Sequence, residues 1–512
     1  TSDVGCSEKL KKSPHLWVAK PPNLGRLMDT IQYEDKVSFW KAKAKAANKE
    51  KRRIKRECAR LLVSRDSYKA EVKTLKATVR AQKQEQSVKL GQVSTLKAKG
   101  HQFPISLVLF CVQCQCVGTT SLRTGRHCII QMYLMFGLNF KVPSHNSIRN
   151  WACKCGYYRS VAEADMSFEE MQKPWVLWVD ESITIGGQKL LLVLGRTAED
   201  WSFECSPTQS SVHVKYIGIS EKWKSEDILA ELDKISKRHK IAYIVSDNGN
   251  NLLGTYKLGS YEHISDITHT LSKALERIFA KDPSFVSMMQ AGNQLRRKWN
   301  LSKEKSCYMP PCQRGKMRFA NIFPTILWAK AMLPLIDKCP KAVAEELAFL
   351  LPNADLINTL FDLQQVLEQL SILFKKYGFS EANKQKAEAM MAALPDTPQS
   401  QKLKASLEKW INATFAAYQR IGISSIFCCS DIIESTFGKF KQKIHANSPF
   451  GLTEFALTIA NFGKDFTKDE IRLALETIKL KKVSAWRPEI DSIAAKKRKF
   501  FKKKVSQEFS RF

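Results

Sequence analysis

"WVLWVDES" (175–182) and "IAYIVSDNG" (241–249) are two apolar runs that each lead into an aspartate, and they decide the fold of this sequence. Runs of this length that are apolar throughout are typical of strands buried on both faces at the centre of a sheet. The first run delivers Asp180 and the second Asp247 to the end of a strand. If the two strands are neighbours, we expect the two carboxylates to lie side by side.

The segments around these runs predict an α/β domain with a mixed five-stranded sheet. "KLLLVLGRTA" (189–198) follows the turn "GGQ", and "VHVKYIGIS" (212–220) follows as a third strand. The amphipathic helix "SEDILAELDKISKRHK" (225–240) then precedes the second apolar run. After a short connection, "YEHISDITHTLSKALERIFA" (261–280) predicts a brief strand running into a helix. The expected order is β-β-β-α-β-α-β.

A second aspartate pattern follows the fifth predicted strand. Asp266 stands directly after it, and His269 lies one helical turn further on. Strand order separates Asp266 from Asp247, because Asp247 is the residue expected beside Asp180. We therefore expect Asp266 and His269 to brace the site or contact a ligand rather than to hold a metal.

Carboxylates at rigid strand ends suit a hard divalent cation such as Mg²⁺, with Mn²⁺ as a substitute. Two such ions about 4 Å apart can clamp the attacking and leaving oxygens of a phosphoryl transfer. A third carboxylate can come from the helix "CCSDIIESTFGKFKQKI" (428–444), where Glu434 stands two turns before Lys441, a candidate for contact with DNA phosphate. The competing interpretation is chance, since the chain has 50 acidic residues and a strand-terminal Asp often starts a turn.

The charge balance favours a polyanionic partner. The sequence has 82 Lys and Arg residues against 50 Asp and Glu residues, a formal net charge of +32. Clustered cations bind nucleic acid by neutralising phosphates and releasing counterions. No apolar run reaches the roughly 18 residues that a membrane span needs, and the sequence does not open on an apolar signal region. We expect an intracellular protein with reduced thiols, bound to DNA and not to a membrane.

The cysteines allow two interpretations. Cys111, Cys114 and Cys116 give the spacing C-x-x-C-x-C, and Cys153 and Cys155 follow downstream. This could be a loose zinc site, but the apolar run 103–118 that holds the first group also predicts a core helix or strand. Buried free cysteines are the favoured interpretation.

A long basic helix is predicted between an irregular N-terminus (1–35) and the apolar run. Residues 36–98 contain no proline, and apolar residues recur every seven positions along them, which favours a coiled coil and hence a homodimer or higher homo-oligomer. The two series of the seam are Ile54, Leu61, Tyr68 and Leu75, and Cys58, Arg65, Val72 and Val79. Basic residues on the same helix that suit contact with DNA backbone are Arg52, Arg53, Lys55 and Arg56.

Residues 119–158 carry the pattern of a helix-turn-helix. A first helix, "SLRTGRHCIIQMYLMFG" (121–137), ends at Gly137, and Ser144 is a candidate N-cap for "HNSIRNWACKCG" (145–156). Ile148 and Trp151 form its packing face. The outward residues expected to meet base edges are His145, Asn146, Arg149 and Asn150. Any small α-hairpin could give the same pattern.

The remaining segments predict an all-α insertion and a basic helical tail. Trp299 in "RRKWN" is a candidate for stacking on a base, although a buried core tryptophan is the favoured interpretation. The expected domains are an irregular N-terminus (1–35), a coiled coil (36–100), a helix-turn-helix (101–160), a catalytic domain in two parts (170–280 and 423–450), the helical insertion (281–422) and a basic C-terminal region (451–512).

With these residues in place, the sequence resembles the DDE transposases with an RNase H-like catalytic domain. The order β(Asp)-β-β-α-β(Asp), followed by a helical insertion and a helix with Glu, is similar to theirs. The blocks that carry the resemblance to a bacterial insertion-sequence group are "WVDESITIGGQKLLLVLG", "IVSDNGNNL", "ISDITHTLSKAL", "CSDIIESTFGKFK" and "SIRNWACKCGYY". They span roughly residues 120–445.

The resemblance implies a DNA transposase in which Asp180, Asp247 and Glu434 hold two Mg²⁺ ions. Water would attack the phosphodiester at an element end, and the freed 3′-hydroxyl would attack target DNA. The pair Asp266 and His269 resembles the D-x-x-H signature of several groups. The sequence departs from the related pattern Y-x2-R-x3-E-x6-K, because Phe427 and Ser430 stand at the Tyr and Arg positions. A non-catalytic DNA-binding relative and a non-transposing nuclease of the same fold are the alternatives.

Overall fold

The computed structural model describes residues 33–89, 96–118, 120–135, 141–161, 172–198, 206–313, 322–444, 451–463 and 465–509, with the single residues 169 and 319. The predicted irregular N-terminus lies outside these residues except for its last three, which begin a helix. The chain divides into two compact units, residues 1–93 and 94–512, and each is described by itself.

The described part of the first unit is one helix, α1 (Tyr33–Lys89), so the predicted long helix is confirmed. Its heptad seam faces solvent in the single chain: Leu61, Tyr68 and Leu75 are 64%, 66% and 57% exposed. Large apolar side chains at this exposure are destabilising in water unless another surface covers them. The predicted self-association therefore remains the simplest explanation of the seam.

Leu61→Glu is expected to disrupt this association, because it places a charge in the apolar seam of each helix. Ala59→Glu is the matched control, since it adds the same charge two residues away at an exposed position outside the seam. Sedimentation equilibrium should show a dimer or larger species for the wild type and the control, and monomer for Leu61→Glu. Equal behaviour of the two variants would remove the coiled-coil interpretation.

A mixed five-stranded sheet forms the centre of the second unit, in the order β3-β2-β1-β4-β5. Its strands are β1 (Pro174–Ile185), β2 (Gln188–Thr197), β3 (His213–Ser220), β4 (Lys240–Ser246) and β5 (His263–Ser265). β1 pairs antiparallel with β2 and parallel with β4. The predicted neighbouring position of the two apolar runs is confirmed, and with it the predicted strand order along the chain.

A tight hairpin joins β1 to β2. Gly186 and Gly187 occupy its two loop positions with φ of 57° and 82°, a backbone region that side chains with a Cβ rarely adopt. This places the predicted "GGQ" turn, and β1 continues through Asp180 to Ile185 before the chain reverses.

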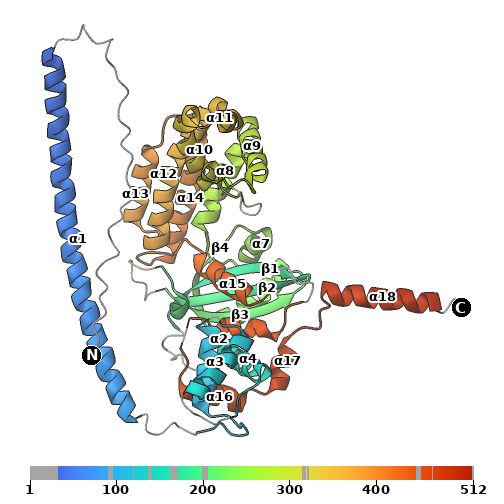
Figure 1. The fold of residues 1–512 in the computed structure, drawn as a ribbon. Coiled ribbons are helices and arrows are strands. Elements are labelled where there is room, and N and C mark those ends of the chain that lie inside the picture. Colours follow the sequence, from blue (N-terminus) through green and yellow to red (C-terminus); the bar gives the residue numbers. More distant parts are fainter. Residues whose placement is uncertain are drawn as a thin grey trace. The chain divides into compact units, whose positions relative to one another are not determined.

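The two faces of the sheet are covered by different helices. Leu177, Val179 and Ile244 pack with α6 (Ser225–Ser236) and α7 (Asn250–Leu258) on one face. Val176, Trp178 and Val245 belong to the larger core on the other face. That core includes α8 (Ile267–Phe279) and α15 (Asp431–Lys443). Figure 1 shows α15 lying over the sheet.

The predicted helical insertion joins the sheet at its β5 edge. Its helices are α9 (Pro283–Trp299), α10 (Phe323–Met332), α11 (Lys341–Leu347), α12 (Ala354–Tyr377), α13 (Glu381–Ala392) and α14 (Pro398–Ile421). In α14, the Trp410 indole N–H donates to the Ser265 carbonyl at 3.1 Å, and Arg420 pairs with Glu262 at 2.7 Å. The insertion is therefore held at both the strand and its preceding loop.

A second group of helices lies at the β3 side of the sheet, away from the insertion (Figure 1). It comprises α2 (Ile105–Cys116), α3 (Leu122–Met135), α4 (His145–Val161), the 3-10 helix η6 (Glu454–Asn461), α16 (Lys468–Thr477) and α17 (Leu480–Trp486). The segments predicted as a helix-turn-helix and as a C-terminal region thus share one core. The Asn461 side chain donates to the Ala152 carbonyl at 2.8 Å within it.

The second helix of the predicted helix-turn-helix is longer than expected. Ser144 caps it as predicted, since its Oγ accepts from the Ser147 N–H at 3.0 Å. However, α4 runs through Gly156 to Val161. A Cβ at Gly156 would lie 2.2 Å from the Leu457 carbonyl oxygen, so this glycine permits close packing of η6 and does not end the helix. The predicted end of the first helix, Gly137, lies outside the described residues.

The last described helix is α18 (Ile493–Phe509), which carries the predicted basic tail. Phe500 and Phe501 are exposed on it, at 68% and 67%. Among the described residues, no helix is long and apolar enough to cross a membrane.

Candidate active site

The two aspartates of the opening runs lie opposite each other on neighbouring strands. Trp178 of β1 is the register partner of Val245 of β4, the last pair of that parallel ladder. Asp180 stands two residues beyond Trp178 within β1, and Asp247 stands two residues beyond Val245, directly after β4 ends, so the two aspartates leave this pair in the same direction and interact through their charges. Neighbouring strands are about 4.8 Å apart. The predicted closeness of Asp180 and Asp247 therefore follows from the parallel pairing of β1 with β4.

One detail of the prediction is wrong. Asp180 does not end its strand, because β1 continues to Ile185 and Asp180 is paired with Leu192 of β2. Only β4 ends here, so Asp180 loses its β4 neighbour but keeps its β2 neighbour. The carboxylate is thereby fixed on a paired strand, which is a more rigid support than a strand end.

Negative charges crowd Asp180. Burial raises the pKa of its carboxyl to about 7, and the charges of Asp247 and Glu434 act in the same direction, with His269 opposing them. A carboxylate that is destabilised by two others needs a counter-charge. The three acidic side chains predicted from the sequence therefore share one electrostatic site.

Glu434 reaches this site because the loop before α15 is pinned at four consecutive residues. The Phe427 N–H donates to the Tyr243 hydroxyl of β4 at 2.9 Å, and the Cys428 carbonyl accepts from the Ile267 N–H at 2.8 Å. The Cys429 carbonyl accepts from the Trp178 indole of β1 at 3.0 Å.

The fourth anchor is Ser430, whose N–H and hydroxyl donate to the Asp266 carboxylate at 2.6 and 3.0 Å. β4, α8, β1 and the β5–α8 junction thus each hold one residue of this loop. Glu434 lies in the first turn of the helix that follows.

His269 contacts Glu434 directly. Its Nε2 lies 3.1 Å from Glu434 Oε1. That hydrogen bond raises the pKa of the imidazole, and the nearby charges of Asp266 and Asp247 act in the same direction. The imidazole orients the Glu434 carboxylate, and its raised pKa favours the protonated form, which offsets negative charge at the site.

Asp266 serves the fold rather than the acidic site. It is fully buried; its Oδ1 accepts from the His269 N–H at 2.7 Å, which caps α8, while Oδ2 accepts both bonds from Ser430. Burial raises the pKa of this carboxyl, and these hydrogen bonds oppose the shift. Both oxygens are occupied, which agrees with the predicted bracing role.

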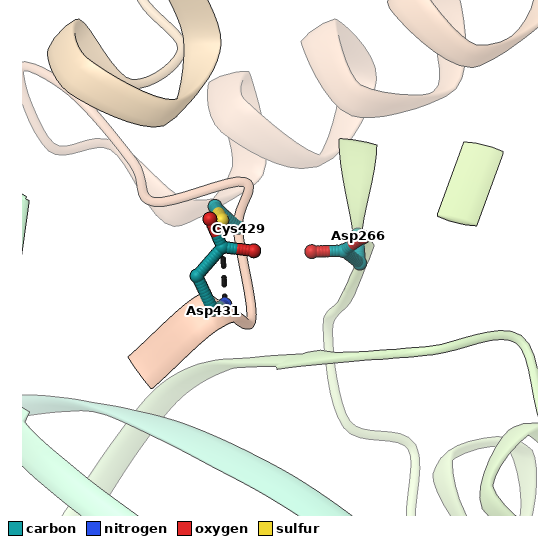
Figure 2. Close-up of side chains that lie close together, drawn as sticks. All are labelled: Asp266, Cys429 and Asp431. Atoms are coloured by element: carbon teal, nitrogen blue, oxygen red, sulfur yellow. Dashed lines mark hydrogen bonds between the residues drawn. The ribbon is translucent and has the colours of Figure 1, made fainter. Parts of the chain in front are cut away.

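Among the described residues, one set of three potential ligands lies within 4.8 Å, and it is not the predicted one. It consists of Asp266, Cys429 and Asp431 (Figure 2). The oxygens of Asp180, Asp247 and Glu434 are therefore spread more widely. A pair of ions about 4 Å apart needs such a spread.

The Asp266–Cys429–Asp431 set has partners of its own. Figure 2 shows the Asp431 N–H donating to Cys429 Sγ, at 3.3 Å. Lys375 pairs with the Asp431 carboxylate at 2.8 Å, and burial raises the pKa of the Cys429 thiol. The Lys375 ammonium group already neutralises Asp431, and the raised pKa keeps the Cys429 thiol protonated. Neither group therefore favours a metal ion at this cluster.

The predicted DNA-contacting residues differ in accessibility. His145 and Asn146 are exposed, whereas Arg149 and Asn150 are half-buried. Arg149 pairs with Glu454 of η6 at 2.7 Å, so the C-terminal segment engages part of the predicted recognition surface. The basic residues of α1 that were predicted to contact DNA backbone are all exposed: Arg52, Arg53, Lys55 and Arg56.

Two further candidates lie in contrasting settings. Lys441 is exposed near the end of α15, as contact with DNA phosphate requires. Trp299 is 1% exposed, and its indole N–H donates to Glu346 at 2.8 Å. The favoured core interpretation of Trp299 is confirmed, and its ring is not available for stacking on a base in this structure.

Several residues that build the site escaped the sequence analysis. Trp178 and Tyr243 each position the loop before α15 through one hydrogen bond, and Ser430, named in the sequence only as a departure from the family pattern, does so through two. Their only sequence signal is a polar atom within an apolar run, at Trp178 and Tyr243. Phe427 and Ser430, at the variant Tyr and Arg positions, are both buried, so they support the loop and do not face a ligand.

The cysteines near α2 and α4 are part of the core. Cys111, Cys116, Cys153 and Cys155 are buried and free. Burial raises the pKa of the Cys111 and Cys153 thiols to about 12. No three of these sulfur atoms, all of them described, lie within 4.8 Å of one another.

No protein-family model matches the sequence, and a search among curated proteins finds no match either.

Proposed function

We propose that this chain is a DNA transposase with an RNase H-like catalytic domain, which cleaves phosphodiester bonds at element ends and joins them to target DNA. The observation that carries the proposal is the parallel pairing of β1 and β4, which ends two residues before Asp180 and Asp247, together with the charges of Asp247 and Glu434 acting on Asp180. The sheet order β3-β2-β1-β4-β5 with an antiparallel β2 supports the fold assignment.

The donor set fits a pair of hard divalent cations. Three carboxylates supply oxygen ligands of the kind that Mg²⁺ and Mn²⁺ prefer. Burial, and after it the charges of Asp247 and Glu434, raises the pKa of Asp180. Asp180, Asp247 and Glu434 would hold the ions. When bound, two such ions stabilise the charge on the attacking and leaving oxygens of an in-line displacement.

The other residues of the site orient and balance these ligands. His269 holds one oxygen of Glu434 through the contact at 3.1 Å and so orients that carboxylate. Asp266 and Ser430 keep α15 in place. The two occupied oxygens of Asp266 leave it as a support for the ligands.

DNA as the partner is supported by charge and its placement. The net charge of +32 is carried in part by α1 and α18, at the two ends of the described chain. Cations on long exposed helices neutralise backbone phosphates without reading sequence. We place the protein on DNA in the cytoplasm, as a homodimer or larger assembly through α1.

Strand cleavage tests the proposal. DNA that carries the repeats flanking the gene is incubated with the protein in Mg²⁺, and the 3′ ends are mapped at nucleotide resolution. The proposal expects cleavage at the repeat boundary and joining to a second DNA. A protein that binds the repeats without cutting would be a regulator, and one that cuts without joining would be a nuclease of the same fold.

Metal affinity is expected to depend on pH. Mg²⁺ would require ionised Asp180, whose pKa is raised to about 7, so the cation competes with the proton on that carboxyl. Below pH 7 the Asp180 carboxyl is mostly protonated, so the affinity for Mg²⁺ should fall about tenfold between pH 8 and pH 6. Calorimetry at pH 7 in two buffers of different ionisation enthalpy should show proton release on binding. Affinity that does not change across this range would contradict the assignment.

A further inference from the structure

A cavity of about 520 Å³ lies in the second unit, where α2, α3, α4, η6 and the C-terminal end of α15 meet. Its lining includes Arg123 of α3, His145 and Arg149 of α4, and Lys443 of α15. None of the described lining residues is acidic. The Glu454 carboxylate next to it is paired with Arg149. The cavity is thus strongly cationic.

Two helix starts point into the same space. Ser121 caps α3, since its Oγ accepts from the Thr124 N–H at 3.0 Å, and Ser144 caps α4 in the same way. The first residues of both helices line the cavity. Helix starts carry partial positive charge and free N–H groups that favour anions.

Gln115 gives an independent indication of a ligand. Its side chain is 2% exposed and lies in the cavity wall, and its Oε1 has no hydrogen-bond partner among the described residues. A buried amide group without a partner is destabilising by about 1–3 kcal/mol. This oxygen is an acceptor, so the sugar hydroxyl or the base amino group of a nucleotide can supply its partner, whereas a phosphate oxygen cannot.

Among the described residues, no carboxylate pairs with Lys443. Its Nζ donates to the Gln115 carbonyl and lies 4.8 Å from the centre of the Phe462 ring. Burial lowers the pKa of this ammonium group to about 8, and the nearby Lys439 charge adds to the effect. A phosphate oxygen beside Lys443 would offset both the burial of its ammonium group and the repulsion by Lys439.

We propose that this cavity binds the phosphate group of a nucleotide, either free or within a DNA strand. Its volume lies in the range of small-molecule sites, roughly 300–1,000 Å³, which accommodates a nucleotide. Binding of a free nucleotide is independent of the proposed function, and binding within DNA rests on it. Lys443 and Glu434 belong to the same helix, α15, so the cavity and the acidic site have a common support.

The test titrates the whole chain at fixed ionic strength, without metal, with inorganic phosphate, 2′-deoxyadenosine 5′-monophosphate and a 5′-phosphorylated single-stranded oligonucleotide. Arg123→Gln and Lys443→Met are each expected to weaken binding of the mononucleotide about tenfold, the effect of one charge-assisted hydrogen bond. Arg126→Gln is the matched control, because Arg126 is exposed one turn along α3 and does not line the cavity. Circular dichroism checks that each variant is folded.

The outcomes separate the sources and the alternatives. Tighter binding of the oligonucleotide than of the mononucleotide, lost in Arg123→Gln, assigns the cavity to DNA, and similar affinities assign it to a free nucleotide. Equal losses in Arg123→Gln and Arg126→Gln would reduce the effect to net charge and overturn the proposal. The proposal would also be overturned if the mononucleotide bound no tighter than inorganic phosphate. No arm requires strand cleavage, so this result stands apart from the proposed catalysis.

Discussion

Asp180→Asn is expected to abolish strand cleavage while making the metal-free protein more stable. The substitution removes a charge that burial and two neighbouring carboxylates destabilise, and raises the free energy of unfolding by roughly 2–4 kcal/mol at pH 8. It also removes a proposed metal ligand, so cleavage should fall at least 1,000-fold, on the order of the loss of one essential catalytic group. Denaturant unfolding and a strand-cleavage assay measure the two effects.

The direction of the pH effect follows from the raised pKa of Asp180. Its carboxyl titrates near pH 7 in the folded chain and near 3.9 in an unfolded one. Between these values only the folded chain holds the proton, so ionising Asp180 lowers stability as the pH rises through this window. The stability gained in Asp180→Asn should therefore grow from pH 4 to pH 7 and then level off.

Glu181→Gln is the control for Asp180→Asn. Glu181 is the next residue of β1, its side chain points to the opposite face, and it pairs with Lys189 at 3.0 Å. The Glu181→Gln variant should retain strand cleavage. Cleavage retained in Asp180→Asn, or a stability gain that is the same at pH 4 and pH 8, would contradict the assignment of Asp180.

Asp266→Ala is expected to cause the largest loss of stability at the site, about 3–5 kcal/mol. It leaves the His269 N–H and both donors of Ser430 without their acceptor in a fully buried position. Cleavage should fall as well, because the start of α15 loses its connection to the β5–α8 junction and Glu434 is no longer held in place.

Two variants make the test of Asp266 specific. Ser430→Ala removes only the hydroxyl bond at 3.0 Å and should cost about 1 kcal/mol. Asp431→Ala changes an exposed carboxylate one residue further on and should cost less. The measurement is urea unfolding with the three variants side by side. A cost for Asp266→Ala no larger than that for Ser430→Ala would show that the carboxylate does not join the two elements.

The centre of the fold could be predicted because its strands are apolar on both faces. Such runs favour buried strands, so 175–179 and 241–245 were expected at the sheet centre, but their pairing was predicted only through the resemblance of the strand order to an RNase H-like fold. Caps were equally predictable, since Ser144 acts through its own backbone neighbourhood. Strand order separates Asp266 from Asp247, and the hydrogen bonds that Asp266 accepts agree with a bracing role, while the choice of Asp247 as the metal ligand stays a prediction.

The features that were predicted wrongly or missed depend on contacts between distant segments. Gly156 has the usual signal of a helix end, and only the nearby Leu457 carbonyl explains why the helix continues. The extension of β1 past Asp180 depends on its hairpin with β2. The four anchors of residues 427–430 come from four separate elements, and no local pattern records such pairings. The joint core of 105–161 and 452–483 is likewise a tertiary property.

Titration of the 512-residue chain with Mn²⁺, followed by calorimetry at pH 8, tests the central claim most directly. The account predicts saturable binding that weakens at least tenfold in Asp180→Ala, Asp247→Ala and Glu434→Ala, since each removes a ligand. Asp431→Ala should bind as the wild type does, because its carboxylate belongs to the neighbouring cluster with Lys375. Binding that is lost in Asp431→Ala and kept in the other three would contradict the account, as would a wild type that binds no Mn²⁺.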